Sequence, residues 1–136
     1  MKAIQFLLLL FVSTFVGFKT AQAQNIIAQP NPPRLVTDVA GVLSPEQLAG
    51  LEKKLVAIDD SSSNQIAVVI IPTLDGYPIE EYATKLFRDW GIGNKKTNNG
   101  ILLLIASNDR KVRIEVGYGL EGAIPDITAN NIRSEE

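Results

Sequence analysis

Residues 65–106 read QIAVVIIPTLDGYPIEEYATKLFRDWGIGNKKTNNGILLLIA and contain two apolar runs separated by an amphipathic segment. The runs at 65–71 and 101–106 have the length and composition of strands that are covered on both faces. Between them, residues 78–90 place apolar side chains at helical spacing. A strand, a helix and a second strand in this order form a βαβ unit, which predicts parallel strands joined by a right-handed crossover.

The segment after residue 106 predicts an antiparallel strand. Residues 107–110 are a short polar turn, and residues 111–116 alternate strictly between charged and apolar side chains. One face of this strand carries Val112, Ile114 and Val116, and the other carries Lys111, Arg113 and Glu115. Such alternation is typical of a half-exposed strand, so we expect a mixed sheet with this strand near its edge.

Upstream of the βαβ unit, the sequence predicts a short strand and a helix. Leu35–Thr37 is the candidate strand. Ser44 has the properties of a helix N-cap, with Pro45 in the first turn and Gln47 as the capping-box partner. Apolar residues then recur at positions 48, 51, 55 and 58, before a polar break at 59–64. The elements together predict a layered α/β domain with a four-stranded sheet.

The amino-terminal part of the chain has the features of an export signal. Residues 1–23 combine Lys2, an apolar run at 4–18 and a terminal Ala-Gln-Ala. This pattern predicts a secretory signal peptide cleaved after Ala23, and a periplasmic or secreted product. The alternative is an uncleaved membrane anchor, although the run is shorter than the roughly 20 residues that span a bilayer. Residues 24–33 contain three prolines and are interpreted as an exposed leader to a domain at 34–136.

Composition excludes several classes of function. The chain has no Cys and no His, which excludes thiol nucleophiles, Ser-His-Asp triads and nearly every zinc site. Removing Lys2 and Lys19 with the signal leaves 11 basic and 15 acidic residues, a net charge of −4. Such a domain is a poor candidate for nucleic-acid binding. Any acid or base must be Asp, Glu, Lys or Tyr, and any metal must be an oxygen-preferring ion such as Ca²⁺ or Mg²⁺.

Two glycine-rich segments, residues 91–100 and 117–126, flank the strand pair. The first enters strand 101–106 and the second leaves antiparallel strand 111–116, so both are expected at the same end of the sheet. The oxygen donors expected there are Asn98, Asn99, Glu115, Glu121 and Asp126. With backbone carbonyls they are candidate ligands of a hard cation. The alternative is that the glycines form tight turns and that Glu121 and Asp126 are solvated or capping residues.

Asp38 has three interpretations. If Leu35–Thr37 is the first strand of another βαβ unit, Asp38 lies at the opposite end of the sheet, where it and Asp75 are candidates for a second metal cluster. If that segment is an extended arm, Asp38 reaches the glycine-rich segments and joins their ligands. The third interpretation is an Asx turn that leads into the Ser44 cap.

Two arginines are candidate phosphate ligands. Arg110 or Arg113 could hold a phosphate beside a bound cation, which is the arrangement that metal-assisted phosphoryl hydrolysis requires. The alternative is that the charged row on strand 111–116 is a solvated face.

Several short motifs resemble the TPM-domain family in order and separation. They are DVAGVLS at 38–44, WGIG at 90–93, NGILLL at 99–104, RKVRIEVGYGLEG at 110–122 and PD at 125–126. The resemblance implies an α/β/α sandwich on a mostly parallel four-stranded sheet, exported or facing a lumen and often tied to a membrane. Phosphatase activity and calcium or magnesium binding are attributed to some members. Members normally continue past Arg133 with a further helix, so we expect this chain to lack a C-terminal segment and to leave apolar surface on one sheet face uncovered.

The first functional hypothesis is therefore an exported TPM-type domain that binds Ca²⁺ or Mg²⁺ through Asp38, Asn99, Glu115, Glu121 and Asp126. It would serve as an envelope accessory or interaction module with a membrane-protein partner. The alternative is a metal-dependent phosphatase for phosphomonoesters, in which Asp38 or Asp126 activates water and Arg110 and Arg113 bind the phosphate. A third hypothesis is a truncated product without independent function.

Overall fold

The computed structural model describes residues 25–124 of the chain. The elements are β1 (Val36–Asp38), α2 (Pro45–Ser62), β2 (Gln65–Ile71), α3 (Ile79–Asp89), β3 (Gly100–Ala106), β4 (Lys111–Val116) and the 3₁₀ turn η1 (Tyr118–Leu120). The predicted signal peptide at 1–23 and the predicted ligand Asp126 lie outside the described residues. Within residues 25–124, no helix has the length and apolar character needed to cross a membrane.

The strands form one mixed sheet in the order β1-β2-β3-β4. β1, β2 and β3 are parallel, and β4 pairs antiparallel with β3. Gln65 lies opposite Gly100 where β2 and β3 begin, and Ile101 lies opposite Val116 where β4 ends. The mixed, mostly parallel four-stranded sheet predicted from the sequence is therefore confirmed.

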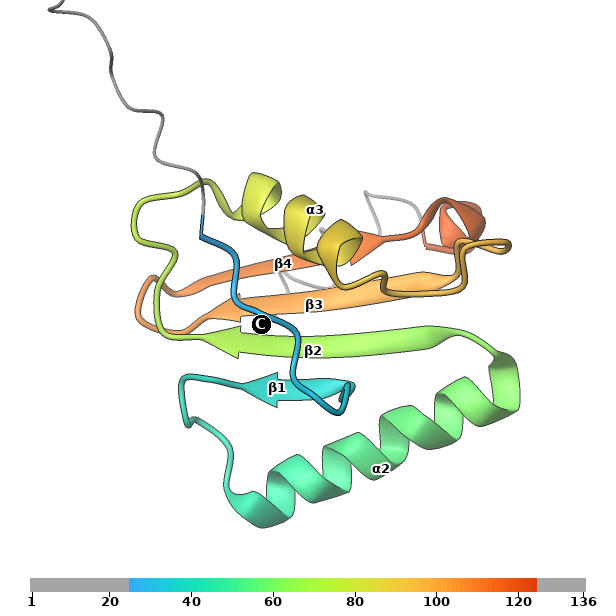
Figure 1. The fold of residues 1–136 in the computed structure, drawn as a ribbon, viewed down its shortest axis with the longest axis horizontal. Helices are drawn as coiled ribbons and strands as arrows, with labels where there is room; N and C mark the ends of the chain where they lie inside the picture. Colours follow the sequence, from blue (N-terminus) through green and yellow to red (C-terminus); the bar gives the residue numbers. More distant parts are fainter. Residues whose placement is uncertain (1–24, 125–136) are drawn as a thin grey trace, which may run out of the picture.

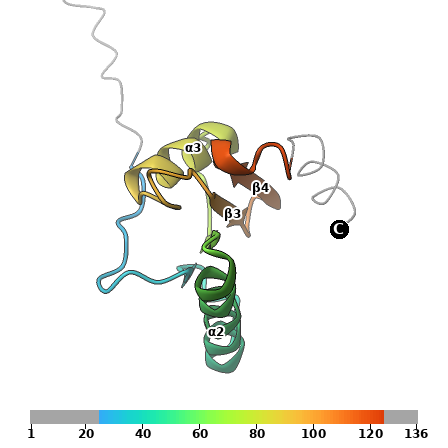
Figure 2. The same ribbon diagram turned by 90° about the vertical axis from the view of Figure 1, so that its right-hand side faces the viewer.

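Helices cover both faces of the sheet, with α3 on one side and α2 on the other (Figures 1 and 2). The larger core lies under α3, where Leu86 and Ala83 pack against Leu102 and Leu104 of β3, all fully buried. Burying apolar surface of this kind is the main favourable term in folding. The arrangement is the α/β/α sandwich that the resemblance implies.

The core under α2 is smaller. Leu55 of α2 packs with Val36, Val68 and Ile70, which belong to β1 and β2. On the same face, the apolar side chains of β3 and β4 are only partly buried among the described residues; they are Ile101, Leu103, Ile105, Val112, Ile114 and Val116. α2 therefore covers the β1–β2 half of this face.

Helix α2 begins as its sequence predicts. The Ser44 hydroxyl accepts a hydrogen bond from the Gln47 amide at 3.2 Å, and the Gln47 side chain accepts one from the Ser44 amide at 2.9 Å. This capping box satisfies two amides that have no partner within the helix. The helix ends at Ser62, and Ser63 then adopts a left-handed conformation with φ 60°.

The segment at 24–33 differs from the exposed leader that the prolines suggested. Ile26 and Ile27 are partly buried against the core under α3. This segment, drawn in blue in Figure 1, crosses the sheet on its way to β1. The prediction weighted the prolines and did not account for the two adjacent isoleucines, which gain free energy by covering apolar core.

Candidate functional site

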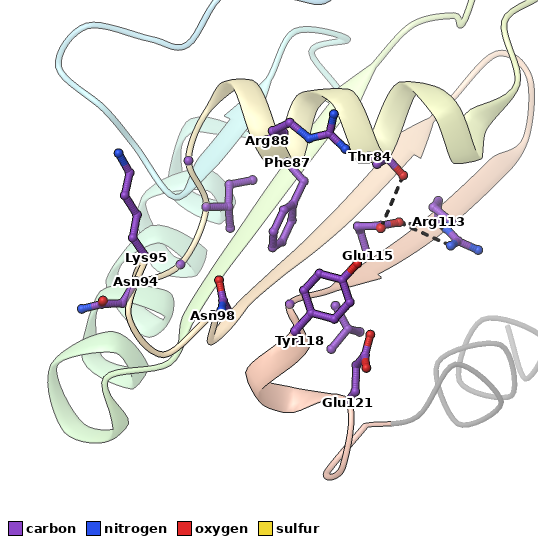
Figure 3. Close-up of a pocket in the computed structure, with 15 residues that line it drawn as sticks. Thr84, Phe87, Arg88, Asn94, Lys95, Asn98, Arg113, Glu115, Tyr118 and Glu121 are labelled. Carbon is purple, nitrogen blue, oxygen red and sulfur yellow. Dashed lines mark hydrogen bonds and ion pairs between the residues drawn. The ribbon is translucent and has the colours of Figure 1, made fainter.

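A cavity of about 420 Å³ lies at the end of the sheet where β3 begins and β4 ends. Its walls are the second half of α3, the loop at 91–98, the end of β4 and the turn η1 (Figure 3). We call this cavity the glycine-loop pocket. Both glycine-rich segments contribute to it, as their predicted location at one end of the sheet requires.

The two glycine-rich segments touch through their backbones. The Gly117 amide donates to the Gly100 carbonyl at 2.8 Å, and the Gly119 amide donates to the Asn98 carbonyl at 2.9 Å. A Cβ atom on Gly119 would overlap the Thr97 carbonyl oxygen, at a separation where two atoms cannot coexist. Glycine is required here because only a residue without a side chain allows this approach.

Two side chains fasten the loop between α3 and β3. The amide oxygen of Asn99 accepts from the Asn94 backbone amide at 2.9 Å, and its amide nitrogen donates to the Ser63 carbonyl. Gln65 accepts from the Gly93 amide at 2.8 Å. Asn99 is 8% exposed, so its side chain is a buried clamp.

The prediction that Asn99 is a metal ligand in the glycine-loop pocket is therefore wrong, because both groups of its side-chain amide are hydrogen-bonded within the protein. Its neighbour Asn98 lines the pocket instead, with φ 48° in the left-handed region. Asparagine tolerates this conformation better than most residues. The two adjacent asparagines are indistinguishable in the sequence, and only the backbone conformation separates them.

Two of the predicted carboxylates line the pocket together. Glu115 projects from β4 and Glu121 follows η1 (Figure 3). The Glu115 carboxylate accepts from Arg113 at 3.3 Å and from the Thr84 hydroxyl at 3.4 Å. Arg113 and Glu115 side chains are 24% and 20% exposed, because β4 turns its charged row toward the α3 side of the sheet. The row is therefore partly sheltered, in contrast to the fully solvated alternative.

Asp38 lies at the other end of the sheet. It pairs with Ile70, whereas the pocket begins at Gly100 opposite Gln65. Five residues of strand separate these points, about 17 Å. The prediction that Asp38 joins Glu115 and Glu121 in one site is therefore wrong, because β1 is a sheet strand and not an extended arm.

The contacts of Asp38 link the end of β1 to the start of α2, but they do not form an Asx turn, in which the side chain bonds the backbone two residues on. One carboxylate oxygen accepts from the Leu43 amide at 2.7 Å, just before the Ser44 cap. The other oxygen is buried without a hydrogen-bond partner among residues 25–124. Among residues 25–124 no group of three or more acidic side chains gathers in a way that could hold a metal ion, either here or at the glycine-loop pocket.

Arg110 also lies away from the pocket. It occupies the hairpin turn with φ 53°, beside Asp109, whose carboxylate accepts from the Leu74 amide at 2.7 Å. Of the two predicted phosphate ligands, only Arg113 lines the glycine-loop pocket. The two arginines do not act together, because Arg110 lies in the turn before β4 whereas Arg113 lies within the strand on the face of the pocket.

The pocket contains residues that the sequence patterns did not single out. Arg88, Lys95 and Tyr118 also line it. In Figure 3 the Tyr118 ring lies between Asn98 and Glu115, whereas the Lys95 side chain extends away from the cavity. Phe87 is partly buried against the core under α3 and also forms part of the wall. Tyr118 is 81% exposed, and its place in the glycine-rich segment at 117–126 was the one sequence feature that pointed to it.

Comparison with known proteins identifies relatives of this chain. A family model described as the TPM domain matches residues 36–136. The solution NMR structure of an N-terminal domain from P. gingivalis is 45% identical, covers 75% of this chain and 65% of its own, and has a TM-score of 0.69. The solution NMR structure of an N-terminal domain from Corynebacterium glutamicum is 22% identical. The match covers 82% of this chain and 72% of that chain with a TM-score of 0.62, which supports the fold. No curated protein matches.

Proposed function

The chain belongs to the TPM-domain family, and from this premise we propose that it binds a divalent cation, Ca²⁺ or Mg²⁺, in the glycine-loop pocket. The observation that carries the proposal is the presence of two carboxylates, Glu115 and Glu121, in one cavity with Asn98. Hard cations prefer oxygen ligands of these types and complete their shells with backbone carbonyls and water. Asp126, two residues beyond the described part, is proposed as a further ligand.

The Arg113 ion pair affects how the cation would bind. A cation that reaches Glu115 competes with the guanidinium for the same carboxylate. Binding therefore releases Arg113, which becomes available to an anionic group beside the cation. This exchange links the cation hypothesis to the phosphate hypothesis in one site.

The second candidate function is a metal-dependent phosphatase for phosphomonoesters. It is favoured by the basic side chains of Arg88, Lys95 and Arg113, which line the same cavity as the two carboxylates. Arginine and lysine bind phosphate oxygens, and a neighbouring cation polarises them. In this proposal Asp126 activates the water. Asp38 has no role in it, because it lies at the far end of β1.

Calcium and magnesium titrations followed by amide NMR test the cation site. We expect shifts in residues 91–100 and 117–124, which Glu115→Gln and Glu121→Gln each weaken. Glu80→Gln is the matched control, since Glu80 is exposed at the opposite end of α3. A spectrum that stays unchanged to millimolar cation rejects the site.

Hydrolysis of a generic phosphomonoester separates the two functions. The phosphatase proposal expects cation-dependent turnover that falls by about 100-fold or more in Arg113→Gln and Asp126→Asn. Asp38→Asn should retain the wild-type turnover. If the cation binds but no turnover is detected, the phosphatase proposal is rejected and the accessory-module proposal is retained.

We also propose that the protein is exported after cleavage of residues 1–23 and serves the cell envelope through a membrane-protein partner. Mass spectrometry of the protein recovered from the expressing cell tests the first part: a mature chain that begins at Gln24 is expected. Recovery of an intact amino terminus in the membrane fraction would favour the anchored alternative.

A further inference from the structure

The segment at 25–30 is hydrogen-bonded to α3 at three points. The Ile27 amide donates to the Tyr82 hydroxyl at 3.3 Å, and the Ile27 carbonyl accepts from the Trp90 indole at 3.0 Å. The Gln29 side chain donates to the Trp90 carbonyl at 3.5 Å. Ile26 and Ile27 pack against the same core. We call residues 25–30 the strap.

Trp90 connects the strap to the glycine-loop pocket. It is the C-cap of α3 and is 8% exposed. The next residue, Gly91, has φ 60° and begins the loop that lines the pocket. Because the strap holds both the indole and the carbonyl of Trp90, it limits the movement of the peptide that enters Gly91.

The loop is thus fastened at two places. The strap holds its entry at Trp90, and Gln65 and Asn99 hold the amides of Gly93 and Asn94. If the contacts of the strap with Trp90 are lost, the hydrogen bonds at Gly93 and Asn94 still hold the loop. The loop then samples more conformations while the sheet remains folded. A cation binds more weakly to ligands in a more mobile loop, because the conformational entropy lost when the loop is ordered opposes binding.

The composition of the strap suits a segment that docks reversibly. Pro30 ends the strap after the isoleucines, and its ring fixes φ and so restricts the conformations open to the segment. A restricted segment loses less conformational entropy when it docks. It also lies directly after the predicted cleavage point at Ala23, so amino-terminal processing decides what is attached to it.

We propose that the strap controls the glycine-loop pocket: when docked on Trp90 it holds the loop in its binding geometry, and when displaced it lowers the cation affinity. The affinity part rests on the proposed cation site. The control of loop order does not, because it concerns only contacts within residues 25–99. The pocket is therefore regulated from a segment some 60 residues earlier in the chain, as the sequence separation of 63 between Ile27 and Trp90 shows.

The test uses Trp90 as an internal probe, because it is the only tryptophan in the chain. The protein is purified after expression of the full chain, as the wild type, Ile27→Ser and Trp90→Phe. Ile58→Ser is the matched control, since Ile58 is an exposed isoleucine on α2. Trp90→Phe removes the indole donor and keeps an aromatic ring in the core.

We expect Ile27→Ser to shift Trp90 emission to longer wavelength and to speed hydrogen exchange at the Gly93 and Asn94 amides. Both variants should weaken calcium binding by about tenfold, a common size for coupling between sites. Slow exchange at Leu102 and Leu104 in β3 verifies that the variants remain folded. Ile58→Ser should leave all three quantities unchanged.

The outcomes are distinguishable. If Trp90 emission shifts but the Gly93 and Asn94 exchange rates do not change, the strap does not control the loop and the proposal is overturned. Unchanged emission in Ile27→Ser also overturns it, because the strap then does not cover Trp90. If the wild type shows no calcium response, the cation site fails, and the exchange rates still decide whether the strap orders the loop.

Discussion

Arg113 and Glu115, two residues apart on β4, form an ion pair of 3.3 Å on the side of the sheet that faces α3. Residues i and i+2 of a strand point to the same face, so the register with β3 places both beside the glycine-loop pocket. The pair offers a carboxylate and a guanidinium to the same cavity. The Glu115 carboxylate attracts a bound cation, whereas the Arg113 guanidinium competes with the cation for that carboxylate.

Replacing Arg113 tests this competition. Arg113→Gln should raise calcium affinity by about fivefold, because the cation then meets an unpaired Glu115 carboxylate, and partly exposed pairs contribute about 1 kcal/mol. Titration calorimetry measures the change. Lys111→Gln on the exposed start of the same strand is the control. A lower affinity in Arg113→Gln would show that the arginine assists binding and does not compete with it.

Gly119 should not accept a side chain. Gly119→Ala drives a Cβ atom into the Thr97 carbonyl oxygen and should lower the free energy of unfolding by about 1–3 kcal/mol. Gly122→Ala is the matched control, because no atom lies within 4 Å of the place that its Cβ atom would occupy. Urea denaturation measures both. Equal stability of the two variants would contradict the close backbone contact.

The adjacent asparagines should behave differently. Asn99→Ala removes the clamp and leaves the Asn94 amide and Ser63 carbonyl without their partner, which should cost about 1–3 kcal/mol of stability. Asn98→Gly should change stability by about 0.5 kcal/mol or less, since Asn98 is exposed and glycine also adopts its left-handed conformation. Calcium binding should weaken in Asn98→Gly. Equal loss of stability in both variants would contradict the division of roles.

Tyr82 should make stability fall at alkaline pH. Burial raises the pKa of Tyr82 above its ordinary value of 10.0; the hydrogen bond from the Ile27 amide opposes this rise, and the charge of Asp75 adds to it. The folded protein therefore retains the phenol proton more strongly than the unfolded chain does. The corresponding stability is fully present below pH 10 and is lost as the pH rises through the raised pKa.

Unfolding measured from neutral to strongly alkaline pH tests the contribution of Tyr82. Tyr82→Phe should show a shallower alkaline decline than the wild type. Tyr118→Phe is the control, because Tyr118 is exposed. An identical pH dependence of stability in the wild type and Tyr82→Phe would show that Tyr82 does not cause the alkaline decline.

Much of the architecture could be predicted from local patterns. The capping box at Ser44, the alternation along residues 111–116 and the buried runs at 65–71 and 101–106 each specify an element without distant information. The hairpin was sufficient to predict that the two glycine-rich segments lie together, because in an antiparallel pair the start of β3 lies beside the end of β4. Two of the predicted carboxylates, Glu115 and Glu121, therefore do line one cavity.

The wrong site predictions share a physical cause. Placing Asp38 required knowing that three residues, Val36–Asp38, pair with β2, and so short a segment carries no periodic signal. Separating Asn98 from Asn99 required the left-handed turn at Asn98. The docking of the strap depends on Trp90, 63 residues later in the chain.

The sequence by itself determined the elements, their order, the excluded chemistries and the oxygen-only character of any metal site, because composition and periodicity act over a few neighbouring residues. Only the tertiary structure decided which side chains meet. It separates Asp38 and Arg110 from the pocket, adds Arg88 and Lys95 to its lining and covers Trp90 with the strap. Strand register and packing of distant segments set these contacts, and both depend on the whole fold.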